Sequence, residues 1–286
     1  MSAVWTISRL TIKEASRRRL LLALLLLTLV VIALNGWGFQ RLTTITDNGK
    51  PITTGEMRTV AATLLILVMF MFSFVLALSA AFVAAPTISS EVESGVTLAV
   101  LARPVRRGEV VAGKWLGLAA LIAAYTTGSS ILELLVVRWT TGYHPVHPVE
   151  MVAYLIGEGV VLMTLTILFS TRLSAITGGV ISVVLFGIAW MAGVVGQFGI
   201  AFDNQAVMGV GSVSRVLLPT DGLWRGATYS LEPPELVAAT LAGGRGARSF
   251  PFFVANPPGT AYVVWVAVWI AIILAVALWS FRRREA

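Results

Sequence analysis

Six long apolar segments constrain this chain more than any other feature of its sequence. A helix needs about 20 mostly apolar residues to cross the roughly 30 Å hydrocarbon core of a bilayer. Charged residues make up only 12% of the chain, which is too few for a soluble protein of this length. We therefore expect an all-α, polytopic integral membrane protein with six transmembrane helices. The predicted spans are Leu20–Phe39, Val60–Ala85, Trp115–Val137, Met151–Phe169, Ser174–Gly196 and Ala261–Phe281.

The distribution of basic residues predicts how the chain is oriented. An even number of spans places both termini on one side of the membrane. Thirteen Lys and Arg residues lie on that side, whereas the short loops of the other side hold four. Long loops cross membranes with little regard to charge, so the segment 197–260 is left out of this comparison. We therefore expect cytoplasmic termini.

Residues 1–19, ahead of the first span, are predicted to form an amphipathic helix. Arg9, Lys13 and Arg17 recur every four residues and therefore share one helical face. Such a helix can lie in the cytoplasmic interface of the membrane. A basic anchor that only orients the first span is the alternative. The residues expected on the opposite face are Val4, Ile7, Thr11 and Ala15.

The segment 197–260 is the longest part of the chain outside the predicted spans. It holds four basic and four acidic residues. One helix is expected at Leu223–Ser230, with Asp221 as its N-cap. Another is expected to begin at Pro233–Pro234 and to end at Gly243–Gly244. We expect these to be short helices at the outer interface rather than a folded ectodomain.

Several kinds of chemistry find no support in the sequence. There is no cysteine, which excludes disulfides and thiolate metal sites. No GxxxxGK(S/T) phosphate loop occurs, so ATP is not bound in that way. His144 and His147 lie in a proline-shaped turn without a third ligand nearby, so no metal site is expected. We attribute the net charge of +7 to one membrane face, not to a nucleic-acid partner, and expect no cofactor on this chain.

Two carboxylates fall within the predicted spans. Ionisable groups at membrane depth are costly and therefore suggest a function. For Glu133 we expect a carboxylate that snorkels to the outer surface beside Arg138, with a place on a substrate path as the alternative. Glu158 lies between Gly157 and Gly159, deeper in its span. A place on a substrate path and a structural hydrogen bond both stay open for it.

The polar segment 86–114 separates the second and third apolar runs. A short helix is expected to have Glu91 and Glu93 near its start, where the helix dipole favours acidic side chains. Arg103 should end it, because the residue before a proline avoids the helical region. A solvated turn held inside by its arginines is the alternative. The residues expected to couple to a partner are Glu91, Glu93, Gly95, Arg103, Pro104, Arg106 and Arg107.

This segment resembles the cytoplasmic loop of type-2 ABC transporter permeases. The resemblance rests on Glu91-x-Glu93-x-Gly95, on Leu101-Ala-Arg-Pro-Val105 and on Gly113-Lys114. It is strongest for the six-span branch that includes permeases linked to multicopper-enzyme maturation. With no cysteine and scattered methionines, the chain shows no soft-metal relay, so a copper role is not carried over.

The resemblance implies a single permease domain, 1–286, in a prokaryotic cell membrane. It implies a second permease copy, identical or related, a surrounding lipid bilayer and a separate soluble ATPase that holds ATP and Mg. The segment 86–114 would then be the coupling loop. The expected activity is export of a hydrophobic or amphipathic substrate. An ATPase-independent channel or scramblase, or an integral-membrane enzyme, is the alternative.

Overall fold

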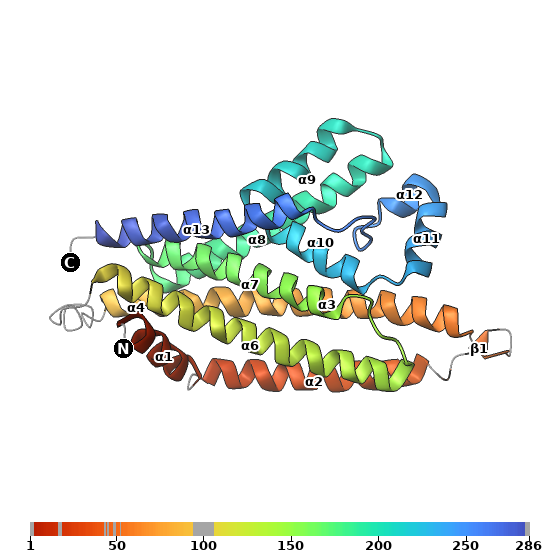
Figure 1. Ribbon diagram of the computed structural model, residues 1–286, viewed down its shortest axis with the longest axis horizontal. Helices are drawn as coiled ribbons and strands as arrows, with labels where there is room; N and C mark the ends of the chain where they lie inside the picture. Colours follow the sequence, from red (N-terminus) through yellow and green to blue (C-terminus); the bar gives the residue numbers. More distant parts are fainter. Residues whose placement is uncertain are drawn as a thin grey trace.

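The computed structural model describes residues 3–16, 19–42, 44, 46–47, 50–51, 53–93 and 106–283. Among these, six helices are long and apolar enough to cross a membrane, which confirms the predicted spans. Figure 1 shows them as an elongated bundle, with shorter helices stacked along one side. The six spans are α2 (Arg19–Leu42), α3 (Thr54–Ala84), α6 (Arg107–Thr141), α7 (Pro148–Ser170), α8 (Ala175–Ala201) and α13 (Thr260–Arg282).

Two of the spanning helices begin several residues before their apolar stretches, at polar N-terminal caps. α6 begins eight residues before the predicted Trp115, and the Glu109 carboxylate accepts a hydrogen bond from the Arg106 backbone N–H at 2.9 Å. α3 begins six residues before the predicted Val60, where Thr53 and Glu56 form a capping box. Apolarity therefore marks what the bilayer covers, whereas capping decides where each helix begins. Between α2 and α3, β1 (Thr46–Asp47) pairs antiparallel with β2 (Lys50–Pro51).

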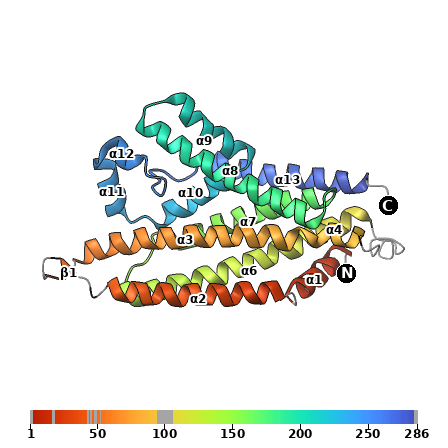
Figure 2. The same ribbon diagram turned by 180° about the vertical axis from the view of Figure 1, so that it is seen from behind.

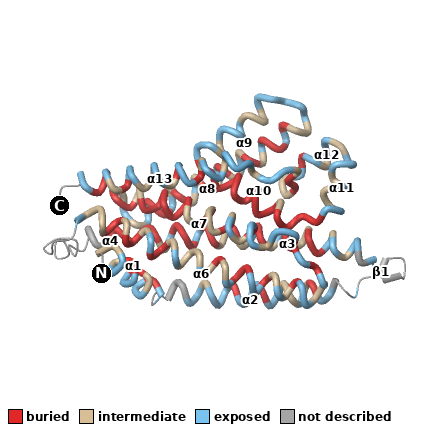
Figure 3. Tube along the Cα trace, in the orientation of Figure 1, coloured by how far each residue is buried: buried red, intermediate tan, exposed pale blue. Residues whose placement is uncertain are grey.

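The core lies between α3, α7 and the helices that face them. Figure 3 shows buried residues concentrated in α7 and in the short helix α10 (Thr220–Leu231), whereas α2 is mostly exposed or partly buried. The outer face of α2 consists of large apolar side chains, as suits a surface against lipid. α2 is thus the least enclosed of the spans that border the cavities described below.

The segment after α8 forms four short helices: α9 (Gln205–Leu217), α10, α11 (Pro234–Ala242) and α12 (Gly244–Arg248). The predicted helices at 223–230 and 234–243 are present. Asp221, however, lies in the first turn of α10, and Pro219 holds the N-cap position.

Helix α10 is not interfacial as expected, because almost all of its residues are buried. A Cβ at Gly222 would meet the Tyr262 ring of α13, and a Cβ at Gly226 would lie 2.6 Å from the Tyr154 ring of α7. The Gly222-x-x-x-Gly226 spacing therefore lets α10 insert between two spans. Sequence reasoning missed this burial because α10 is too short and polar to resemble a core helix.

Both termini lie at the same end of the bundle (Figures 1 and 2), as an even number of spans requires. Helix α1 (Ala3–Ser16), helix α4 (Pro86–Glu93) and the first turn of α6 gather at this end. The group formed by α1, α4 and residues 106–117 is called the coupling surface below.

Candidate coupling surface and intramembrane polar sites

The coupling surface is built on two glycines of α6. A Cβ at Gly113 would lie 2.7 Å from Ile7 Cβ, and a Cβ at Gly117 would lie 2.7 Å from the Ser8 backbone oxygen. Both distances are shorter than any real contact, so α1 reaches α6 only because these positions lack side chains. Thr11 and Ala15 are buried in this contact. The predicted helix is present over Ala3–Ser16, and the face that holds Ile7, Thr11 and Ala15 lies against α6.

A buried lysine joins α4 to α6. Lys114 is 7% exposed, and its ammonium donates a hydrogen bond to the Thr87 backbone oxygen. The other face of α1, with Arg9 and Lys13, is exposed. The glycine contacts and this lysine therefore fix both α1 and α4 to the first turns of α6.

The turn between α7 and α8 is tied to α13 at the same end. The Arg172 guanidinium donates from Nε to Ser280 Oγ at 3.0 Å and from Nη2 to the Ser280 backbone oxygen at 3.1 Å. Thr171 Oγ1 and Ser280 Oγ lie 2.8 Å apart. These contacts join the turn between α7 and α8 to α13 at the end of the bundle that holds the termini.

The predicted coupling residues fall into three groups. Arg106 caps α6 and is exposed, and Arg107 is the first residue of that helix. Glu91 and Glu93 lie on α4. Gly95, Arg103 and Pro104 lie outside the described residues.

The expected start of the coupling helix near Glu91 is wrong. α4 begins at Pro86, directly after α3 ends, so Glu91 and Glu93 do not lie in its first turn. Proline is favoured at a first helical position because its fixed φ suits the helix. The backbone N–H at that position makes no hydrogen bond within the helix, so its absence in proline costs nothing. The dipole argument for the two glutamates therefore does not hold for α4.

Glu158 is enclosed in the bundle. It is 2% exposed, and both its carboxylate oxygens lie 2.8 Å from Ser73 Oγ of α3, which donates to them. Beside it, a Cβ at Gly159 would lie 2.8 Å from Ile122 Cγ2 of α6. The structure therefore gives Glu158 a hydrogen bond that joins α7 to α3.

Glu133 borders a cavity of about 70 Å³ between α2, α3 and α6, called the polar cavity below. Two oxygen atoms around it find no hydrogen-bond partner in the described part of the chain, Glu133 Oε1 and Ser130 Oγ, and the Asn35 amide lies close to the Glu133 carboxylate. In hydrocarbon each unsatisfied group costs several kcal/mol. The cavity is large enough for a water molecule or a small polar group, which would satisfy these atoms.

The expected snorkelling of Glu133 is wrong. Its carboxylate is 3% exposed, whereas Arg138 is exposed, and the described residues show no ion pair between the two. α6 continues to Thr141, eight residues beyond Glu133, so the carboxylate lies more than two turns from the helix end. That distance exceeds the reach of a glutamate side chain.

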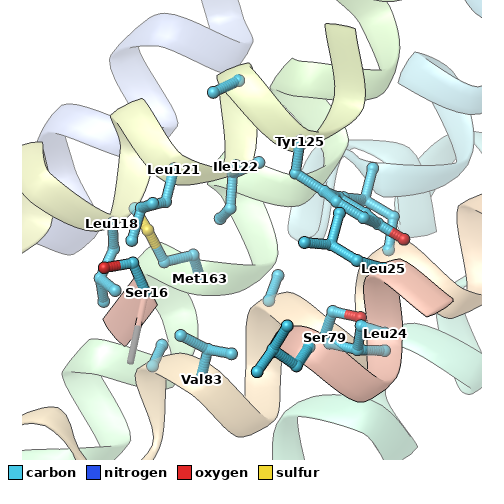
Figure 4. A pocket seen from close by; sticks show the side chains of 15 residues that line it. Ser16, Leu24, Leu25, Ser79, Val83, Leu118, Leu121, Ile122, Tyr125 and Met163 are labelled. Atoms are coloured by element: carbon cyan, nitrogen blue, oxygen red, sulfur yellow. The ribbon is translucent and has the colours of Figure 1, made fainter. Parts of the chain in front are cut away.

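A second cavity of about 340 Å³, the apolar cavity, lies between the same three helices on the side of the coupling surface. Figure 4 shows Tyr125 and Leu25 at one end and Ser16 and Leu118 at the other. Tyr125 lines the apolar cavity and Thr28 lines the polar one, and their hydroxyl oxygens lie 2.6 Å apart. One hydrogen bond between α2 and α6 thus stands between the two cavities.

Sequence reasoning missed the polar face of α6 that holds Glu133. Thr126, Ser130 and Glu133 are spaced by four and three residues, which places them on one face of α6. This spacing was a usable signal, because a polar stripe within a span faces the protein interior. Asn35 gave no such signal, since only the packing of α2 on α6 brings it near.

Comparison with known proteins agrees with this architecture. Residues 5–286 match the sequence profile of the family described as ABC-2 family transporter protein. A protein named probable ABC transporter permease protein NosY, from Pseudomonas aeruginosa, is 27% identical over 307 residues, and the match covers 99% of each chain. Six spans and a profile match over nearly the whole length lead to one assignment. The chain belongs to the ABC-2 transporter family and is the membrane-spanning permease subunit of an ABC transporter.

Proposed function

We propose that the coupling surface docks a separate soluble ATPase, which binds ATP and Mg, and that a second permease copy completes the transporter. The observation that carries this proposal is the fixed contact of α1 and α4 with α6. A partner that moves α4 or α1 moves the start of a 35-residue span with them. With one ATPase on each permease copy, ATP-driven closure of the two ATPases can thereby move the membrane-spanning helices.

The basic residues of the terminal end support a cytoplasmic location for this surface in a prokaryotic cell membrane. Positive charge is retained on the cytoplasmic side of membranes. The structure brings residues from four separate helix ends to the end that holds the termini (Figure 1). The described basic residues there are Arg9, Lys13, Arg106, Arg107, Lys114, Arg172, Arg282 and Arg283.

Charge reversal at Arg103 and Arg107 tests the docking role. We expect the Arg103→Glu, Arg107→Glu variant to insert normally but to retain much less ATPase on affinity purification, because like charges across an interface are repulsive. The matched control, Arg138→Glu with Arg245→Glu, makes the same charge change at exposed positions on other parts of the chain. Equal recovery of the ATPase with both variants would count against docking at this surface.

We propose that the cargo is hydrophobic or amphipathic and is exported along the region between α2, α3 and α6. The apolar cavity accommodates an apolar body, and the polar cavity offers unsatisfied hydrogen-bonding atoms beside it. In this proposal Glu133 borders the path directly, and Glu158 holds α7 to α3 next to it. α2, which is the least enclosed of these helices, is the one that moves.

The substitution Glu133→Gln tests this assignment. We expect it to lower cargo-stimulated ATP hydrolysis about tenfold, because a hydrogen bond to a charged group contributes about 1.5–3 kcal/mol. The same substitution at Glu158, which lies outside both cavities and keeps an acceptor for Ser73, should leave stimulation near wild type. The measurement is hydrolysis by the reconstituted transporter against a panel of lipophilic compounds. The reverse order of effects would place the path at Glu158.

A further inference from the structure

A third cavity, of about 540 Å³, lies where α9, α10 and the segment before α13 meet. It is separate from the two cavities beside α2 and shares no lining residue with them. In the described part of the chain, every charged residue that lines it is an arginine: Arg215, Arg225 and Arg248. Hydrogen-bonding side chains complete its polar wall, namely Gln197, Ser212, Asn256 and Tyr262.

One buried carboxylate holds two of these arginines in place. Asp221 Oδ2 lies 2.8 Å from Arg215 Nε and 3.5 Å from Arg225 Nε. The Asp221 carboxylate itself sits against Gly193 of α8, where a Cβ would lie 2.3 Å from its Cγ. Two guanidinium groups therefore share a single negative charge, and one positive charge is left over.

Arg225 is built into the wall rather than exposed to solvent. The residue is 9% exposed, and its Nε makes no hydrogen bond within the described residues. The Gln197 amide lies against the terminal nitrogens of this guanidinium, and turning the amide by 180° would let its oxygen accept from them. Burial lowers the Arg225 pKa to about 10, so the group stays charged at neutral pH.

The next carboxylate along the chain does little to offset this charge. Glu232 accepts a hydrogen bond from the Val254 backbone N–H at 2.9 Å, and its other oxygen has no partner in the described part of the chain. Burial raises the Glu232 pKa to about 8, so most of these groups are neutral at pH 7. Together with Arg248, the wall then carries about two positive charges in excess of Asp221.

We propose that this cavity binds the phosphate group of an organic molecule with an apolar body. Guanidinium groups match the planar, two-point geometry of phosphate oxygens. The rest of the wall is apolar and includes Phe253, Val254 and Pro257. The volume lies within the range of small-molecule sites. A lipid headgroup and a soluble organic phosphate share this chemistry.

The test measures the thermal stability of the purified, detergent-solubilised chain during titration with phenyl phosphate, with benzyl alcohol as the uncharged control. A ligand that binds only the folded state raises the melting temperature as its concentration exceeds Kd. We expect phenyl phosphate to stabilise the chain and benzyl alcohol to have no such effect. Added salt should weaken the response, because the attraction is electrostatic.

Two substitutions on the same helix provide the matched comparison. Arg248 lines the cavity, whereas Arg245 pairs with Asp203 at the surface, 2.9 Å away, and does not line it. We expect Arg248→Gln to raise the half-saturating phenyl phosphate concentration at least tenfold and Arg245→Gln to leave it unchanged. Equal shifts for the two variants, or equal stabilisation by benzyl alcohol, would overturn the proposal.

Repeating the phenyl phosphate titration in lipid nanodiscs distinguishes a lipid headgroup from a soluble organic phosphate as the natural ligand. If the natural ligand is a lipid headgroup, phosphatidic acid in the disc should compete with phenyl phosphate and raise its half-saturating concentration. If it is a soluble molecule, discs with and without phosphatidic acid should give the same titration. Both results support the site, and loss of the phenyl phosphate response in every disc would contradict it. The test needs no ATPase, so its result is independent of the docking proposal.

Discussion

Replacing Gly117 by leucine is expected to separate α1 from α6 and to remove most ATPase binding. A Cβ at this position would already lie 2.7 Å from the Ser8 backbone oxygen and 2.9 Å from Thr11 Cβ. A backbone atom cannot rotate aside, so α1 has to move. Overpacking costs about 1–3 kcal/mol, which corresponds to about a fivefold to 150-fold weaker contact. The measurements are ATPase co-purification and hydrogen exchange of the α1 amides.

The same helix supplies the control for this experiment. A Cβ at Gly128 would meet no atom within 4 Å, so Gly128→Leu adds an equal side chain to α6 without touching α1. We expect that variant to retain its ATPase and to protect α1 amides as the wild type does. Unchanged α1 protection in the Gly117→Leu variant would show that the glycine contact is dispensable.

Loss of the Ser73 hydroxyl is expected to destabilise the whole bundle. Ser73 Oγ donates the only hydrogen bond that the described residues offer to the Glu158 carboxylate. Leaving a buried acceptor without its donor costs about 1–3 kcal/mol, and more for a charged group. We therefore expect Ser73→Ala to lower the melting temperature of the purified chain by several degrees.

Two further variants show whether the carboxylate is the cause. Ser79 lies on the same helix but donates to its own Val75 backbone oxygen, so Ser79→Ala should have a small effect. Ser73→Ala combined with Glu158→Met replaces both partners by apolar groups, which should recover most of the lost stability. A double variant no more stable than Ser73→Ala alone would assign the loss to packing.

The six spans could be predicted from the sequence because a membrane-crossing helix needs nothing but length and apolarity. The short helices could be located but not placed in depth. Depth depends on which surfaces are close enough to meet, and for α10 that is decided by Gly222 and Gly226 against Tyr262 and Tyr154. Those tyrosines belong to spans remote in the sequence, so no local pattern contains the answer.

The candidate sites divide in the same way. The polar stripe of α6 was readable from residue spacing, and the amphipathic pattern of α1 identified which of its faces is buried. The surroundings of the two glutamates could not be predicted from the sequence. Glu158 accepts a hydrogen bond from Ser73 on another helix, whereas Glu133 lines a cavity. The difference lies in tertiary packing, which gives two similar carboxylates different surroundings.

The glycine contact between α1 and α6 also has a consequence for how the protein is made. Ile7 and Gly113 touch, yet more than 100 residues separate them along the chain. At about 5–20 residues per second, a ribosome reaches Gly113 roughly 5–20 s after Ile7. During that interval the glycines of α6 are not yet available to α1, and the exposed Arg9 and Lys13 can bind anionic lipid headgroups. Helix α1 therefore reaches its final position only after Gly113, near the start of the third span, has been synthesised.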